Sequence, residues 1–156
     1  MSLDNYNKAM ALMEGNKTKG YFAGPRSGER IKLAENRIGL QFSGMYRKFL
    51  ESYGAGSFGS QEIYGVISSD FENSSVPDAI WYTLTERKEI GLPPNLLVIY
   101  DTGSGELVCL DFSQRNKDNE PAVVSFVPGV SLEKQSYEKI ADDFGDFLLD
   151  LVSREI

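Results

Sequence analysis

Three carboxylates, Asp101, Glu106 and Asp111, lie on or beside one predicted β-hairpin and are the side chains best suited to chemistry. A pair of carboxylates can supply the acid and the nucleophile or base of glycoside hydrolysis, and a group of them can hold a metal ion. The competing interpretation is structural, because acidic residues are common in hairpin turns and a half-buried Asp111 would bond a backbone N–H. We favour the structural interpretation, which predicts no catalytic residue, metal site or cofactor. A carboxylate-based hydrolase is the remote alternative.

The chain contains one cysteine, Cys109, and no histidine. Cys109 lies in the apolar run 107–110, where a thiol behaves as a small hydrophobe, and there is no imidazole to deprotonate it. Ser-His-Asp hydrolases, HExxH metalloproteases and zinc deaminases all need histidine, so these enzyme classes are excluded. We therefore expect a non-enzyme with a buried core thiol. The lone cysteine also fits a cytoplasmic protein.

The net charge of -7 and the isoelectric point near 4.7 bear on the choice of partner. Direct nucleic-acid binding is not expected, because it requires basic surfaces that displace counterions from phosphates. An acidic surface instead suits a basic partner, whose association it would accelerate by steering, although charge alone equally allows a role in solubility. No run approaches the roughly 18 apolar residues that cross a bilayer, and no signal-peptide pattern is present, so we expect a soluble protein without a membrane partner.

Amphipathic spacing predicts helices at residues 4–14, 27–39, 43–53, 77–89 and about 138–151. We expect Ser43 to cap the third helix and Gly54 to end it in the left-handed conformation. Pro77 is expected in the first turn of the fourth helix, with Trp81 in the core. The inward stripe of the third helix consists of Tyr46, Phe49, Leu50 and Tyr53.

The last predicted helix has two contrasting faces. One face should pack against the rest of the protein, and the other should be acidic and exposed to solvent. The apolar face consists of Ile140, Phe144, Phe147, Leu148 and Leu151. The acidic side consists of Glu138, Asp142, Asp143, Asp146 and Asp150.

Strand patterns occupy the middle of the chain. Residues 96–100 form an uninterrupted apolar run typical of a central strand covered on both faces. Strands at 107–112 and 122–127 follow, joined by short polar loops, which predicts an antiparallel meander. An earlier extended run, residues 58–66, contains Gly65, which indicates a bulge or a close backbone approach.

Taken together, these elements predict one α+β domain over residues 1–156. An antiparallel or mixed sheet of about four to six strands should pack with about four or five helices. No internal repeat or low-complexity tract divides the chain.

The segment 35–54 resembles the signature E..LG..LP..Y..FL...NG of the SMI1/KNR4 (SUKH) family. Gln41-Phe42 stands where that family usually has Leu-Pro, and Tyr53-Gly54 replaces the more frequent Asn-Gly. Further blocks extend the resemblance over most of the chain, which implies an SMI1/KNR4-like fold. These blocks are LLVI at 96–99, VCLD at 108–111, PAVV at 121–124 and IADDFGDFL at 140–148.

The resemblance implies a non-catalytic role. Bacterial SUKH proteins resemble one another as immunity proteins that bind and neutralise toxin domains of polymorphic or contact-dependent systems, often nucleases. The implied partner is then a cognate toxin domain with a basic nuclease cleft. Fungal relatives regulate cell-wall synthesis, so a regulatory or scaffold module is the alternative. We expect a monomer or a weak homodimer.

A toxin-binding surface should carry a few aromatic anchors within an acidic rim and bury on the order of 1,200 to 2,000 Å². Candidate residues are those expected to be exposed on loops or on outer helix faces. They are Asp70, Glu72, Tyr82, Glu86, Asp101, Glu106 and Asp118.

Overall fold

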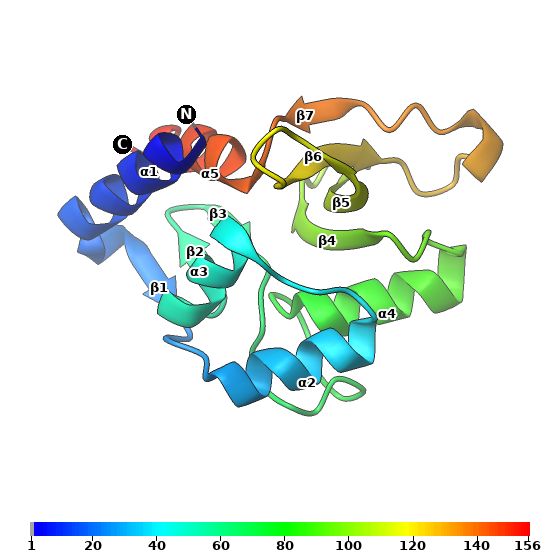
Figure 1. Cartoon of the computed structure of the whole chain (residues 1–156), viewed down its shortest axis with the longest axis horizontal. Coiled ribbons are helices and arrows are strands. Elements are labelled where there is room, and N and C mark those ends of the chain that lie inside the picture. The colour runs from blue at the N-terminus through cyan, green and yellow to red at the C-terminus, as the bar shows by residue number, and fades with distance from the viewer. Residues whose placement is uncertain (1) are drawn as a thin grey trace.

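The computed structural model describes residues 2–156, which form five α-helices and seven strands. The helices are α1 (Ser2–Gly15), α2 (Gly28–Ile38), α3 (Gly44–Ser52), α4 (Ala79–Ile90) and α5 (Phe144–Ser153). The strands are β1 (Gly20–Phe22), β2 (Gly56–Phe58), β3 (Gln61–Ile63), β4 (Leu96–Asp101), β5 (Leu107–Arg115), β6 (Pro121–Phe126) and β7 (Lys139–Ala141). They make two antiparallel sheets, β1-β2-β3 and β4-β5-β6-β7 (Figure 1). The predicted α+β class is confirmed, with the strands divided between two sheets.

Strands β4, β5 and β6 form the predicted antiparallel meander. The expectation that β4 is a central strand is wrong, because β4 is the outer strand of its sheet. Its residues 96–99 are nevertheless buried, and α4 packs against this strand (Figure 1). On the outer edge of β4, the Ile99 carbonyl accepts a 2.9 Å hydrogen bond from Tyr64 N–H. The apolar run therefore indicated burial on both faces rather than the position of the strand in the sheet.

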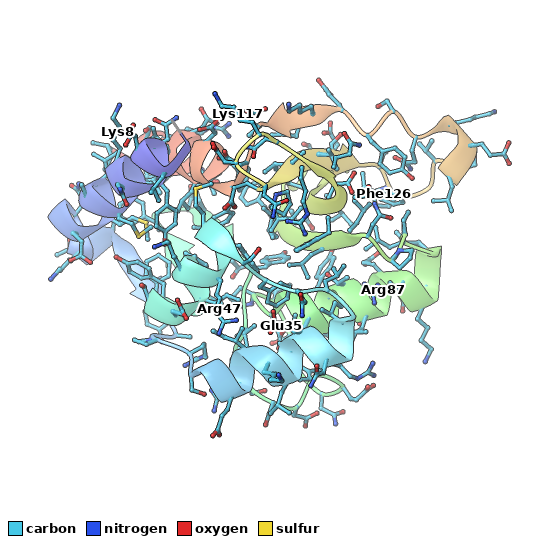
Figure 2. The ribbon with its side chains drawn as sticks, viewed as in Figure 1. Lys8, Glu35, Arg47, Arg87, Lys117 and Phe126 are labelled. Carbon is cyan, nitrogen blue, oxygen red and sulfur yellow. The ribbon has the colours of Figure 1, made fainter. Side chains whose placement is uncertain are left out.

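The predicted pair of helices α2 and α3 is organised around Glu35. Gly39 ends α2 in the left-handed conformation with φ of 76°, as its place after the apolar stripe indicated. The Glu35 carboxylate then accepts a 2.6 Å hydrogen bond from the backbone N–H of Phe42. Its other oxygen lies 3.8 Å from Arg47 of α3, and Figure 2 shows Glu35 and Arg47 between the two helices.

Helix α3 is capped from another part of the chain. The predicted cap is wrong, because Ser43 occupies the N-cap position but its side chain makes no capping bond. Glu120, from the connector between β5 and β6, accepts a 3.4 Å hydrogen bond from Met45 N–H instead. The inward face of α3 is confirmed, since Tyr46 and Phe49 are buried with their ring centroids 5.1 and 5.5 Å from that of Phe144.

The extended run at residues 58–66 contains a turn. Gly59 takes the left-handed conformation, so the run belongs to a hairpin of β2 and β3 rather than to one strand. Glu155, just beyond α5, stabilises this turn by accepting a 2.9 Å hydrogen bond from Ser60 N–H. The close backbone approach expected at Gly65 is confirmed, because a Cβ there would overlap the carbonyl oxygen of Gly54.

The start of the last helix also differs from its prediction. Ile140 belongs to β7 rather than to a helix and is 42% exposed. Helix α5 begins only after Asp143, whose carboxylate accepts hydrogen bonds from Asp146 N–H at 3.0 Å and from the Asn116 amide at 3.1 Å. Asp143 is therefore a buried N-cap and not part of a solvent-exposed acidic face. Pairing of β7 with β6 outweighs the helical periodicity at this point.

Candidate functional site

Helix α4 presents one face to the core and two strips to the surface. Its N-terminus is fixed by Asp78, whose carboxylate accepts hydrogen bonds from Ile80 N–H at 2.9 Å and Trp81 N–H at 3.2 Å. Asp78 rather than Pro77 thus begins the helix, which corrects the expected role of Pro77. Ile80 and Thr83 point inward, and the Thr83 hydroxyl accepts a 3.0 Å hydrogen bond from Val98 N–H of β4.

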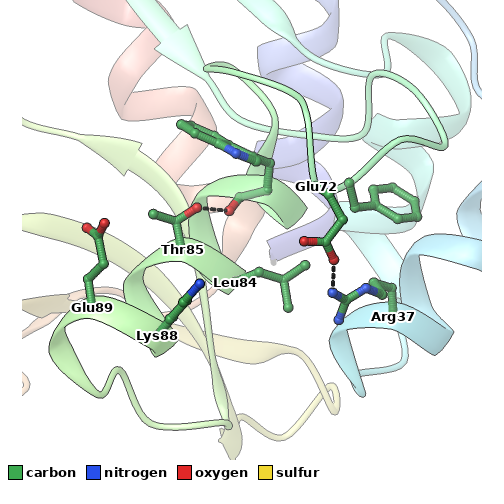
Figure 3. Close-up of a pocket in the computed structure, with 8 residues that line it drawn as sticks. Arg37, Glu72, Leu84, Thr85, Lys88 and Glu89 are labelled. Carbon is green, nitrogen blue, oxygen red and sulfur yellow. Dashed lines mark hydrogen bonds and ion pairs between the residues drawn. The ribbon is translucent and has the colours of Figure 1, made fainter.

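The first strip lines a groove of about 450 Å³, here called the α4 groove. The residues of α4 in this strip are Trp81, Leu84, Thr85, Lys88 and Glu89. Figure 3 shows Arg37 of α2 paired with Glu72 at one side, and Lys88 and Glu89 at the other side of Leu84 and Thr85. The apolar part of the groove comes from three side chains. They are Phe71, Trp81 and Leu84.

The second strip carries Tyr82 and Glu86, one helical turn apart, and faces the β4–β5 hairpin. The Tyr82 hydroxyl donates a 3.4 Å hydrogen bond to Asp101, whose other oxygen accepts a 2.9 Å bond from Gly103 N–H. Tyr82 also packs at 5.3 Å between ring centroids against Tyr64. Residues from three parts of the chain therefore meet at one point.

This second strip is electrostatically uncompensated. Partial burial, followed by the carboxylates of Glu89 and Asp101, raises the pKa of Glu86 above its ordinary value. Burial, Asp101 and Glu86 raise the pKa of Tyr82 to about 12. No lysine or arginine within residues 2–156 forms an ion pair with Glu86, Glu89 or Asp101. The carboxylates of this strip are thus available to cations from outside the chain.

The structure brings some of the candidate residues together and separates others. Tyr82, Glu86 and Asp101 adjoin, and Glu72 lies on the neighbouring groove. Asp70 accepts hydrogen bonds from the N–H groups of residues 72 and 73 and so shapes the loop that carries Glu72.

Two further candidates lie at opposite ends of β5. Glu106 directly precedes this strand in the β4–β5 hairpin, and Asp118 follows it in the next loop. The β5–β6 ladder, which runs from the Leu107–Phe126 pair to the Arg115–Pro121 pair, lies between them. Asp118 therefore does not belong to the α4 surface, a name used here for the two exposed strips of α4 together.

Trp81 was expected in the core, and that expectation is wrong. Its side chain is partly exposed and lines the α4 groove. Trp81 and Ile80 are consecutive, so a helix that buries Ile80 turns Trp81 toward another side. The spacing of Trp81, Leu84, Thr85 and Lys88 at i, i+3, i+4 and i+7 was the signal that could have revealed a second stripe.

Asp111 is separated from the other two hairpin carboxylates, Asp101 and Glu106. Asp111 is buried and accepts hydrogen bonds from the Asn95 amide at 2.8 Å and from Ser113 N–H at 2.9 Å. Glu106 is five residues away along the strand, roughly 16 Å at the usual rise. Asp101 lies at the far end of the β4–β5 ladder from Asp111. The structural interpretation of Asp111 is supported by these bonds.

Two further expectations concern the burial of Cys109 and the presence of a membrane-spanning helix. Cys109 is fully buried, as expected, and burial raises the pKa of its thiol above the ordinary value. No helix within residues 2–156 has both the length and the hydropathy to cross a membrane.

A family model described as SUKH_6, SMI1-KNR4 cell-wall, matches residues 28–148. This chain belongs to the SMI1/KNR4 (SUKH) family. The match runs from the start of α2 into α5 and so includes the whole α4 surface.

In this SUKH protein, residues that carry the family resemblance have structural roles. Glu35 and Gly39 shape the turn between α2 and α3, and Asp111 fixes the end of the β4–β5 ladder. Apart from Arg37, the residues of the α4 groove and of the Tyr82 strip lie outside those blocks. The recurring SUKH pattern therefore specifies the frame, while the surface that α4 presents is specified separately.

Proposed function

We propose that this SUKH protein is an immunity protein. It would act in the cytoplasm, bind a cognate toxin domain of a polymorphic or contact-dependent system and neutralise it by occlusion, without catalysis or cofactor. The expected toxin is a nuclease. Family membership supports this proposal, because bacterial SUKH proteins resemble immunity proteins.

The observation that carries the proposal is the meeting of Tyr82, Glu86 and Asp101 on an unpaired acidic surface. A nuclease domain binds phosphates and so needs a basic cleft. Carboxylates without internal cations offer such a cleft a complementary potential, which favours fast and specific association. The overall charge of -7 acts in the same direction at longer range.

Aromatic side chains give this surface a second property of protein-binding sites. Trp81 and Tyr82 lie edge to face at 6.2 Å between ring centroids, and both are partly exposed. Tryptophan and tyrosine are enriched among the residues that dominate binding energy, especially when surrounded by polar groups that exclude water. The surface thus combines anchors with an acidic surround.

The test is co-expression with the toxin domain encoded by the adjacent gene. We expect cells to survive only when this SUKH protein is present, and a catalytically inactive toxin variant to co-purify with it as a stoichiometric complex. Growth arrest despite soluble SUKH protein, together with the absence of a complex, would overturn the immunity proposal. Survival without a complex would also contradict neutralisation by occlusion.

A regulatory or scaffold module is the second candidate function. The description of the matching family refers to the cell wall, which favours this alternative. A deletion strain distinguishes the two functions. An immunity protein should be dispensable when the toxin gene is also deleted, whereas a regulator of wall synthesis should leave a morphology or wall-stress defect in the double deletion.

A further inference from the structure

The two exposed strips of α4 are contiguous and differ in chemistry. Glu89 belongs to both, because it lines the α4 groove and also acts on the ionisation of Glu86. A segment of another protein that crosses α4 would therefore meet the apolar part of the α4 groove and then the carboxylates of Glu86 and Asp101.

We propose that the α4 groove receives an apolar side chain of a basic partner, and that the lysine or arginine next to this side chain binds Glu86 and Asp101. This inference rests on the proposed function for the identity of the partner as a toxin domain. The recognised chemistry is narrower than a general acidic surface: one aromatic or large aliphatic anchor followed by a cation.

The size and lining of the groove support an apolar anchor. Its volume of about 450 Å³ lies within the range of roughly 300–1,000 Å³ typical of binding pockets. Phe71 lies buried below, and Trp81 and Leu84 supply apolar walls. The Trp81 indole N–H has no hydrogen-bond acceptor within residues 2–156, so a partner carbonyl can accept its bond.

The charges around the groove indicate where the cation lies. At one side Arg37 and Glu72 neutralise each other, and both side chains are largely exposed. At the other side the carboxylates of Glu86, Glu89 and Asp101 outnumber Lys88, the one cation among the groove-lining residues on that side. A basic residue beside the anchor is therefore drawn toward Glu86 rather than toward Arg37.

The same charges argue against two other occupants. A second copy of this chain would bring its own net charge of -7 and its own Glu86 carboxylate to the interface, which costs energy through like-charge repulsion. A nucleic acid would bring phosphates to the same carboxylates. A basic protein segment is the occupant that the charge distribution favours.

The test uses capped tripeptides and the only tryptophan of the chain, Trp81, as reporter. We would titrate the protein with acetyl-Lys-Trp-Arg-amide and acetyl-Glu-Trp-Glu-amide while following the Trp81 indole N–H in a ¹⁵N spectrum, in which the unlabelled peptides are silent. We expect the basic peptide to shift this signal at about fivefold lower concentration than the acidic peptide. A signal unmoved by both peptides, or moved equally, would overturn the inference.

Three variants separate the parts of the proposed site. Thr85→Phe should fill the groove without changing charge and abolish the response to both peptides. Glu86→Lys should keep the groove but remove the preference for the basic peptide. Asp118→Lys makes the same charge change at the far end of β5 and should leave the response unchanged. Each variant is first compared with the unmodified protein by circular dichroism and thermal unfolding.

The toxin complex then distinguishes failure of this inference from failure of the proposed function. Thr85→Phe and Glu86→Lys should each weaken binding of the inactive toxin variant by about tenfold or more, and Asp118→Lys by less than about twofold. Normal binding by both folded α4 variants would move the site elsewhere while leaving the immunity function intact. No binding by the unmodified protein would contradict the immunity function itself.

Discussion

Glu35 and Phe42 are joined by a 2.6 Å hydrogen bond from the Phe42 backbone N–H to the Glu35 carboxylate. The bond spans the turn between α2 and α3 and directs the chain after Gly39. The Glu35 side chain is only 15% exposed, so water does not readily replace it. This contact gives a structural role to the glutamate that begins the segment 35–54, which resembles the SUKH signature.

Glu35→Ala should lower the free energy of unfolding by about 1–3 kcal/mol, because it leaves the Phe42 N–H without an acceptor. Glu35→Gln keeps an acceptor oxygen and should cost less than about 1 kcal/mol. Urea unfolding followed by circular dichroism measures both values. Equal stabilities of the two variants would show that the hydrogen bond does not stabilise the turn.

Two N-cap positions with similar residues should respond differently to alanine. Asp143→Ala removes the acceptor for Asp146 N–H and should cost about 1–2 kcal/mol. Ser43→Ala removes no capping bond and should change stability by less than about 0.5 kcal/mol. The same denaturation measurement compares them, and a Ser43 variant as unstable as the Asp143 variant would contradict the assignment of the α3 cap to Glu120.

Gly65→Ala should destabilise the protein by about 3 kcal/mol or prevent folding, because the new Cβ would overlap the Gly54 carbonyl. That carbonyl also accepts a 3.0 Å hydrogen bond from Val66 N–H, so it is not free to move. Gly15→Ala, with open space around its Cβ, is the matched control and should change stability by less than about 1 kcal/mol. A Gly65 variant with an unchanged melting temperature would refute the close approach.

Glu86→Gln should stabilise the protein at neutral pH by about 0.3 kcal/mol. Burial, Glu89 and Asp101 raise the pKa of Glu86, so its ionisation destabilises the folded state as pH rises through the interval between the unfolded and folded pKa values. Below the unfolded value the carboxyl is protonated in both states and the penalty is absent. Melting temperatures at several pH values should therefore show a gain that vanishes by about pH 4.

The control for this experiment is Glu86→Asp, which keeps the charge and should show no gain at neutral pH. A gain for Glu86→Gln that grows on acidification would contradict the sign of the shift. Comparison with Glu86→Lys would show whether removing the repulsion or adding a cation matters more.

Elements controlled by neighbours in sequence were predictable. The stripe of α2, its end at Gly39 and the hairpin between β4 and β5 follow from spacing and turn residues. The cap of α3 was not predictable, because Glu120 comes from a distant connector. The strand β7 was missed because pairing with β6 outweighs the helical periodicity around Ile140.

The candidate surface was predictable residue by residue but not as an arrangement. Tyr82, Glu86 and Asp101 were chosen for expected exposure, yet their meeting depends on how α4 packs beside β4. Trp81 was assigned to the core because one apolar stripe was expected, whereas α4 has a buried stripe and a groove-lining stripe. An aromatic residue directly after a fully buried helix position, as Trp81 follows Ile80, can therefore belong to a second, exposed stripe.

Helices α1 and α5 lie side by side, with the Asn5 amide donating a 2.7 Å hydrogen bond to Asp146. Figure 1 shows α1, which begins at Ser2, and α5 on the other side of the molecule from α4. An affinity tag, a fluorophore or a resin linkage at either end would consequently leave α4 accessible. The neighbouring ends also make a circularly permuted chain feasible, with new termini opened in an exposed loop such as 102–105 for tests of folding order.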